Sequence, residues 1–452
     1  MWEDVYRNDA PWLKKRVRSL RIPSSVCKEL KRLIMTEFSA SITYPHYNGG
    51  SSPVKSQHDL QKTDANRTEG VTFPHPPLDT VFQKSIPMLR RKLDFGLAMG
   101  GMLFKPYWTA NGIQLDFVPQ NQYLPIHYTA DFCDAVACPE TVTIEKVSYT
   151  RIEIHNYDRA SQTHTIENRC FRSDSPAFLG KECSLSEVPV WSGMLAYKKF
   201  YNVRNPLFSV FQIPDSNSID PDSPLGISAF SDAVDFIRDA DEQWERILWE
   251  LESSERAIDA SEDLFRFKGG KPELPKGRER MFRTFSNNPN TGTGIFETFS
   301  PEIRDSSYFN AFNQMLRRIE SSCGLSYGTL SEVSDVEKTA EEVKSSKQRS
   351  FSRVSDIQES LRTALENMVS GMQYLRDYYE NRRNGDVTLK CTFGDGILED
   401  ADKEFNRRLQ MVTAGLYSKE QFVMWYFSCD ESSAVKLMPK MEGIFDANAF
   451  TI

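Results

Sequence analysis

The most regular pattern of apolar positions along the chain lies in the segment 230–251. Seven apolar side chains recur there at steps of three or four residues: Phe230, Ala233, Ile237, Ala240, Trp244, Ile247 and Leu251. Because an α-helix completes a turn about every 3.6 residues, this spacing places all seven on one face. The pattern predicts a long amphipathic helix that follows the turn-rich segment 214–222 and ends near Glu255.

Two more helices are predicted after it, with a polar loop between them. The first begins near Tyr308 and ends at Gly324, a residue type that favours the C-terminal cap of a helix. Thr339 and Glu342 have the spacing of a capping box, so the next helix is expected to begin there and to continue for about forty residues. The segment 325–338 between these two helices shows no strong periodicity, which predicts a loop.

The first half of the chain is predicted to combine helices with an antiparallel β module. Segments 1–45 and 78–98 carry apolar residues at helical spacing. An Asn-Gly pair within 102–118 supplies the positive φ angles of a tight hairpin turn, and a second hairpin is expected at 149–171. Residues from 100 to about 200 are therefore interpreted as β-rich.

Two segments of a different character complete the pattern. The insert 257–304 breaks the helical periodicity, carries candidate strands at 264–267 and 295–298, and has a basic first half. Four of its basic residues are Lys271, Lys276, Arg278 and Arg280. The C-terminal segment is expected to hold a strand at 387–393 and short helices at about 401–414 and 418–427.

Composition and charge narrow the classes of function. A chain of 452 residues with 39% hydrophobic and 26% charged residues is a folded protein of two to four modules. The formal net charge of -8 disfavours a sequence-independent DNA-binding protein, because such proteins hold phosphates with surplus Lys and Arg. From residue 231 to 256 there are nine acidic and three basic residues, so this helix face is either simply solvated or a wall that repels an anion.

Few residues suggest chemistry. All six histidines precede residue 165, and no nucleophile elbow, metalloprotease motif or phosphate-binding loop accompanies them. Eight scattered cysteines form no CxxC pair, which predicts buried free thiols rather than a zinc site or a disulfide framework. The D-x-D pairs at 220–222 and 239–241 lie in a turn and on a helix, and neither is expected to bind metal. We expect no cofactor and no catalytic residue.

Targeting signals are also missing from the pattern. The longest apolar run, 95–104, is too short and too rich in glycine to span a bilayer. The N-terminus lacks the basic-then-apolar order of a signal peptide, so the chain is expected to stay in the cytosol of the cell that makes it.

Several short segments, in their order and spacing, resemble a known family. They are 149–155 (YTRIEIH), 206–208 (PLF), 223–228 (SPLGIS), 303–304 (IR), 324–331 (GLSYGTLS) and 338–343 (KTAEEV). Together they resemble the portal proteins of tailed bacteriophages, specifically the head-to-tail connector subunits of long-tailed phages of Gram-positive hosts. The resemblance covers most of the chain, although no single segment is diagnostic.

The resemblance implies an α+β portal fold with a β-rich wing, a helical-hairpin stem, a small α/β clip, a long wing helix and a helical crown. By position, the parts are the wing at 1–225, the stem helices at 226–256 and 305–324, the clip at 257–304, the tunnel loop at 325–338, the long wing helix at 339–384 and a short crown at 385–452.

The resemblance also implies a function and partners. About twelve subunits of such a protein form a ring at one capsid vertex of the virion, and the ring surrounds a channel for double-stranded DNA. The terminase large subunit packages DNA through it, and the DNA is later ejected. The other expected partners are the major capsid and scaffolding proteins and the head-completion or tail adaptor protein; no membrane is involved. Assembly would take place in the cytoplasm of the host bacterium.

Two sets of site residues follow from the same resemblance. In the tunnel loop, the residues expected to meet DNA are Thr329, Ser331, Glu332, Ser334, Asp335, Glu337 and Lys338. Hydroxyl groups and the lysine can reach phosphates, while the carboxylates limit the contact. In the clip, Lys271, Lys276, Arg278 and Arg280 are expected to face the terminase and later the tail adaptor.

Two other classes of function remain open at this point. A helical adaptor that forms no ring would show the same periodicities, but it would be a monomer or a dimer. A metal-dependent enzyme, such as a nuclease or a glycosyltransferase, would use Asp220 and Asp222 and would lose activity when either is replaced by Ala.

Overall fold

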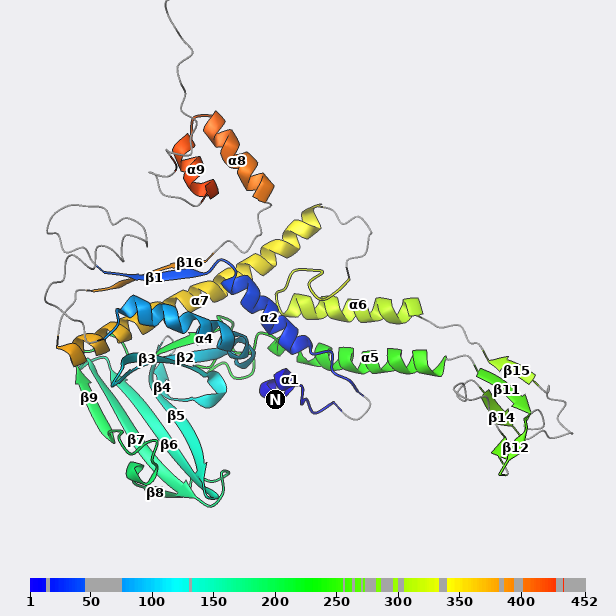
Figure 1. Ribbon diagram of the computed structural model, residues 1–452, viewed down its shortest axis with the longest axis horizontal. Coiled ribbons are helices and arrows are strands. Elements are labelled where there is room, and N and C mark those ends of the chain that lie inside the picture. The colour runs from blue at the N-terminus through cyan, green and yellow to red at the C-terminus, as the bar shows by residue number, and fades with distance from the viewer. Residues whose placement is uncertain are drawn as a thin grey trace, which may run out of the picture. The chain divides into compact units, whose positions relative to one another are not determined.

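The computed structural model describes most of the chain. The described residues are 1–13, 17–44, 75–129, 132–254, 257–261, 265–269, 271–272, 282–285, 296–299, 305–332, 340–381, 386–393, 401–427 and 434. The fold is α+β (Figure 1), and the chain divides into two compact units. The first unit holds residues 1–44 and 77–393, and the second holds 45–76 and 394–452.

The N-terminal segment forms two helices and a strand. Helix α1 is Trp2–Arg7 and helix α2 is Ile22–Met35, so the helix predicted over 1–45 is confirmed for these two ranges. It is wrong for residues 8–13 and 17–21, which are not helical. The prediction is wrong for strand β1, Ser39–Thr43, which pairs antiparallel with β16, Thr388–Thr392. The backbone hydrogen bonds of β1 therefore depend on a strand more than 300 residues away, a partner that local periodicity does not reveal.

This pairing also places the predicted C-terminal strand. The strand expected at 387–393 forms, and it lies in the first unit beside β1. The C-terminal part of the second unit begins at Gly394. Its helices α8, Ala401–Thr413, and α9, Lys419–Phe427, agree with the two predicted short helices and contact each other through Phe405 and Phe422.

A three-stranded sheet and two helices form the main core. Strands β2, Gly101–Thr109, and β3, Gly112–Pro119, form the predicted hairpin, and β10, Ser209–Gln212, pairs with β2. Helix α4, Leu78–Met99, and helix α7, Ala340–Glu380, pack against this sheet. The sheet contributes three fully buried rings to the core, those of Phe104, Phe117 and Phe211.

A second sheet has six strands in the order β4-β5-β6-β7-β8, with β9 also paired to β7. The strands are β4 Leu124–Thr129, β5 Phe132–Ile144, β6 Val147–Asp158, β7 Thr163–Ser173, β8 Lys181–Cys183 and β9 Tyr197–Tyr201. Strands β6 and β7 form the hairpin predicted at 149–171. Two 3₁₀ turns lie nearby, η1 at Gln120–Gln122 and η2 at Leu185–Glu187.

The predicted helical hairpin is present. A 3₁₀ turn η3, Ser231–Ala233, leads into α5, Val234–Ser253, and α6, Asp305–Ser322, lies antiparallel beside α5 (Figure 1). The 41-residue helix α7 has the length that its capping box and stripe predict. Within the part of the chain that the structure describes, no helix is both long enough and apolar enough to cross a bilayer.

The insert between α5 and α6 forms two small sheets. Strand β11, Ala257–Ser261, lies between β14, Phe282–Phe285, and β15, Phe296–Phe299, and it is parallel to β14 but antiparallel to β15. Strands β12, Phe267–Lys268, and β13, Lys271–Pro272, form a short hairpin. The described residues of this insert are strands and turns without a helix, whereas an α/β clip was expected.

Candidate functional site: the helical hairpin and its loop

The root of the hairpin is fixed to the main sheet by one buried amide. The side chain of Gln120 accepts a hydrogen bond from the backbone N–H of Gly226 (3.1 Å) and donates to the carbonyl oxygens of Gly226 (2.7 Å) and Met99 (2.9 Å). A Cβ atom on Gly226 would lie only 2.2 Å from the carbonyl oxygen of Gly100, so this approach requires glycine. The segment that leads into α5 is therefore positioned by backbone contacts.

The apolar stripe of α5 is buried at its start and exposed at its end. Phe230, Ile237 and Ala240 are almost fully buried, and Trp244 packs against Phe312 of α6 with ring centroids 5.6 Å apart. Leu251, the last position of the stripe, is exposed. The stripe thus predicts the helix correctly, but the hairpin of a single chain does not cover its whole length.

Acidic groups occupy much of the outer side of α5. Asp235, Asp239 and Glu252 are exposed. The guanidinium nitrogens of Arg238 lie 3.4 Å from a carboxylate oxygen of Asp235 and 3.5 Å from one of Asp239. Asp241 is an exception, because its buried carboxylate accepts hydrogen bonds from Trp12 Nε1 (3.0 Å) and from the backbone N–H of Leu20 (2.8 Å).

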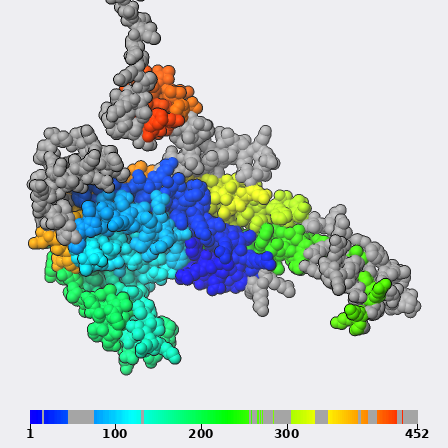
Figure 2. Space-filling view, viewed as in Figure 1, coloured from blue at the N-terminus to red at the C-terminus, as the bar shows by residue number. Residues whose placement is uncertain are grey.

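Burial raises the pKa of Asp241, while the hydrogen bond from Trp12 lowers it in part. Figure 2 shows the blue N-terminal segment lying against the hairpin, where these contacts form. Asp239 is exposed and Asp241 is buried, so the two carboxylates of this D-x-D pair lie on different sides of the helix, as the sequence predicts.

The loop after α6 begins with residues that are held against the helix. Glu320, which is 1% exposed, accepts hydrogen bonds from the backbone N–H groups of Gly328 (3.3 Å), Leu330 (2.5 Å) and Ser331 (2.8 Å). The oxygen of Glu320 that accepts from Gly328, Oε2, also accepts a hydrogen bond from the Ser331 hydroxyl at 2.8 Å. A carboxylate suits this position because its two oxygens only accept, and four donors converge on them.

A second contact lies two helical turns earlier on α6. Asn313 accepts a hydrogen bond from the backbone N–H of Glu332 at 2.8 Å and donates to its carbonyl oxygen at 3.3 Å. Between these two points, the guanidinium of Arg317 lies 4.6 Å from the ring centroid of Tyr327. The segment 325–332 therefore runs back along α6.

These contacts show how two of the expected loop residues are bound within the chain. The Ser331 hydroxyl is buried and donates to Glu320, and the hydroxyl of the half-buried Thr329 donates to the carbonyl oxygen of Ser326 at 2.5 Å. Glu332 is exposed, as expected. The loop candidates outside the described residues are Ser334, Asp335, Glu337 and Lys338.

The insert shows part of its predicted basic surface. Lys271 is exposed on β13, and Arg266 and Lys268 are exposed beside it. The other three clip candidates, Lys276, Arg278 and Arg280, lie outside the described residues.

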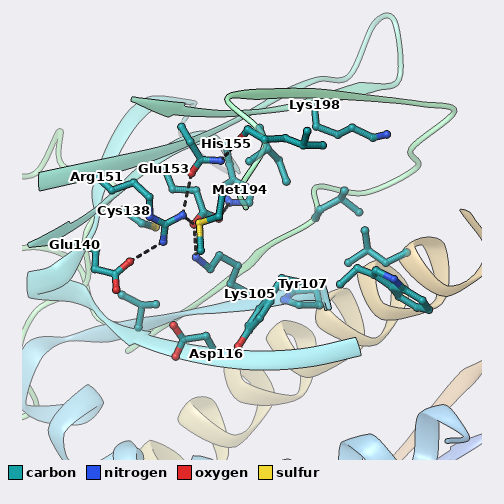
Figure 3. Close-up of a pocket in the computed structure, with 18 of the residues that line it drawn as sticks. Lys105, Tyr107, Asp116, Cys138, Glu140, Arg151, Glu153, His155, Met194 and Lys198 are labelled. Atoms are coloured by element: carbon teal, nitrogen blue, oxygen red, sulfur yellow. Dashed lines mark hydrogen bonds and ion pairs between the residues drawn. The ribbon is translucent and has the colours of Figure 1, made fainter. Parts of the chain in front are cut away.

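A polar cavity of about 680 Å³ lies between the sheet that contains β2 and β3 and the sheet that contains β5 and β6 (Figure 3). Glu153 of β6 is at its centre and contacts Lys105 Nζ of β2 (3.0 Å), Arg151 (3.0 Å) and His155 Nε2 (2.8 Å). Arg151 also pairs with Glu140 of β5 at 2.7 Å. Burial by itself would raise the pKa of Glu153, but the hydrogen bond from His155 and the charges of Lys105 and Arg151 hold it well below its usual range.

The histidines extend this network inward. His155 Nδ1 lies 3.1 Å from His164 Nε2, and the backbone N–H of Leu207 donates to His164 Nδ1 at 3.5 Å. Burial, and then the nearby His155, lower the pKa of His164 well below its usual value. A neutral His164 satisfies every one of these contacts, and the charges around Glu153 are paired. The network therefore fits a structural role, as the sequence suggests for these histidines.

Other candidate chemistry also has a structural explanation. Asp220 and Asp222 are exposed in a turn, where the Asp220 carboxylate accepts the backbone N–H of Asp222 at 3.3 Å. Among the described residues, no group of three or more His, Cys, Asp or Glu side chains is placed to hold a metal ion.

The seven described cysteines are free thiols, as expected, and four of them are buried. Two of them, Cys170 and Cys183, face each other across β7 and β8 with Sγ atoms 3.3 Å apart. Cys429 lies outside the described residues.

No known family model matches the chain, and no curated protein matches its sequence.

Proposed function

We propose that this chain is the subunit of a bacteriophage portal, a ring around a channel through which double-stranded DNA is packaged and later ejected. One observation carries the proposal: large apolar side chains remain exposed on both helices of the hairpin. They are Phe236 (37% exposed), Trp249 (59%), Leu251 (41%) and Phe309 (46%).

The directions of two of these residues suggest what covers them. Trp249 and Leu251 are two residues apart on α5, so their side chains point to different sides of the helix. One partner on one side cannot cover both. A neighbouring copy on each side can, and that arrangement, in which one face of a hairpin meets a different face of the next, closes into a ring.

The charge of the hairpin is compatible with a channel for DNA. DNA that must slide through a channel cannot be held tightly by its phosphates, and binding to phosphates requires surplus Lys and Arg. The exposed Asp235, Asp239 and Glu252 of α5 give the opposite sign. Carboxylates repel phosphates most strongly at short range, within a Debye length of about 8 Å at physiological salt.

The order of the parts also supports the proposal. A β-rich body leads into α5, a stranded insert, α6, a loop and the long helix α7, which is the order that the resemblance implies. On this reading the insert contacts the terminase and then the tail adaptor, the body contacts capsid and scaffolding proteins, and the chain carries no catalytic site. The protein is then a component of the virion at the portal vertex.

Native mass spectrometry and electron microscopy of the purified protein test the ring directly. We expect a closed ring of about twelve subunits with a central hole. The double variant Trp249→Ser, Leu251→Ser should shift the population to monomers, because it removes the apolar surface that neighbours cover. Arg246→Ser, at an exposed position of the same helix, is the matched control and should leave rings intact.

A wild-type protein that is monomeric or dimeric over a range of salt and protein concentrations would contradict the proposal. That outcome would instead favour a helical adaptor that forms no ring.

A further inference from the structure

The base of the loop after α6 is held at two points, although residues 328–332 have no regular secondary structure of their own. The first point is the Glu320 carboxylate with its four hydrogen bonds from residues 328–331. The second is the Asn313 amide, which binds both backbone groups of Glu332. Two fixed points on one helix determine both the position and the direction of the chain between them.

We propose that Glu320 and Asn313 are positioning residues that hold the segment 328–332 along α6 and set the point at which the loop leaves the hairpin. The proposal rests on the function proposed above, because it concerns the loop that would meet DNA.

The chemistry at Glu320 is specific to a carboxylate. Three backbone N–H groups and one hydroxyl donate to Glu320, and each of its two carboxylate oxygens accepts two of these hydrogen bonds. In Glu320→Gln, one oxygen becomes an NH₂ group that would face N–H donors, and at least one buried donor would lose its partner. Hydrogen bonds to a charged acceptor contribute more to stability than hydrogen bonds between neutral groups do.

The arrangement also decides which side chain DNA would meet first. The hydroxyls of Thr329 and Ser331 bind within the chain, as shown above. Of the described residues 325–332, Glu332 is the exposed one, and Asn313 holds its backbone so that its carboxylate stays at the surface. This part of the loop therefore presents a negative charge rather than hydroxyl groups, and it would repel phosphates instead of binding them.

We call the contacts of Glu320 and Asn313 with residues 328–332 the clamp. Hydrogen exchange of the purified wild-type protein and of Glu320→Gln tests whether the clamp holds this segment. We expect at least one of the amides of Gly328, Leu330 and Ser331 to exchange roughly ten- to a hundredfold faster in the variant, which is the loss of one charged hydrogen bond expressed as a rate ratio. Glu320→Asp keeps the carboxylate on a shorter side chain and should restore part of the protection.

Two variants control for unspecific effects. Glu380→Gln removes another buried carboxylate, one that pairs with Arg376 on α7, and it should not change exchange at residues 328–332. Asn313→Ala should speed exchange of the Glu332 amide, and Asn310→Ala, at an exposed position one turn earlier, is its matched control and should not. Unchanged exchange of Gly328, Leu330 and Ser331 in Glu320→Gln would overturn the proposal.

Packaging and retention of DNA in particles test the positioning role. In Glu320→Gln, we expect rings of normal size but a severalfold loss of retained DNA, with partial rescue by Glu320→Asp. If exchange rises and rings form but DNA retention stays normal, the clamp only stabilises the fold and the positioning role is wrong. If the wild-type protein forms no ring, the proposed function fails while the exchange result on the clamp still stands.

Discussion

The body of the first unit and the helical hairpin both contain amphipathic helices, yet they bury the apolar faces of these helices to different extents. On α7, five apolar positions are at most 1% exposed: Ile357, Leu361, Ala364, Leu365 and Met368. On the hairpin, the stripe of α5 ends in an exposed Leu251, and α6 leaves Phe309 exposed. Helix α7 is thus covered by contacts within the chain, whereas the hairpin leaves apolar side chains exposed.

The reason lies in the number of neighbours that each helix has. Helix α7 contacts strands β2, β3, β10 and β16 and helix α2, and its partners form hydrogen bonds to its flanks, such as Ser209 Oγ to the carbonyl oxygen of Ala364 at 2.6 Å. Along most of their length, α5 and α6 contact mainly each other. A two-helix contact covers only one face of each helix.

The largest effect on the body is expected from Glu153→Gln. This change leaves Lys105 and Arg151 charged and buried beside a neutral amide, and breaking a buried ion pair in this way costs about 3–5 kcal/mol. Denaturant unfolding of the isolated subunit measures the loss. A change below 1 kcal/mol would mean that solvent already compensates these charges.

A matched pair of leucines tests the comparison between body and hairpin directly. Leu365→Ala should lower the free energy of unfolding of the subunit by about 2–5 kcal/mol, because it opens a cavity in a packed core. Leu251→Ala, at the exposed end of the hairpin, should change it by no more than about 0.5 kcal/mol but should weaken assembly. Equal losses from both changes would show that the hairpin is as self-sufficient as the body.

The buried His164 makes the body sensitive to acid. Its folded-state pKa lies well below the usual 6.5, so below that pH the unfolded chain binds a proton that the folded chain does not. Its contribution is therefore present above pH 6.5 and is lost as the pH falls, at up to about 1.4 kcal/mol per pH unit. Unfolding measured from pH 7 to pH 5 should show this slope in the wild-type protein.

His164→Gln should flatten that slope, whereas His127→Gln should not, because His127 is exposed beside Asp134. If both variants retain the wild-type slope between pH 7 and pH 5, another group causes the acid sensitivity. The hairpin offers no buried histidine of this kind among its described residues, so this pH effect belongs to the body.

The smallest effect on stability is expected from the insert. Reversal of Lys276, Arg278 and Arg280 to Glu changes only charge, so unfolding and ring assembly should remain at wild-type values within about 0.5 kcal/mol. DNA packaging driven by the terminase should decrease, because like charges would meet at the expected contact. Normal packaging would identify this basic segment as an ordinary solvated turn.

Periodicity in the sequence was enough to determine the helices and two of the hairpins. The spacing of apolar residues in α5 and α7, and the Asn-Gly turn before β3, depend only on local geometry and are visible without a structure. The same local signals missed β1, whose hydrogen bonds come from β16, more than 300 residues away along the chain. Pairing between distant strands leaves no local pattern.

For the hairpin and its loop, too, some features could be predicted from the sequence and others could not. The sequence placed a polar loop after Gly324 and an acidic face on α5, because composition and periodicity determine both. Only the tertiary structure decided that Asp241 turns inward to Trp12, that Glu320 and Asn313 hold the loop, and that the Ser331 hydroxyl is buried. Whether a polar group faces solvent or a buried partner depends on which donors and acceptors folding brings within about 3 Å of it, and the spacing of residues along the chain does not contain that information.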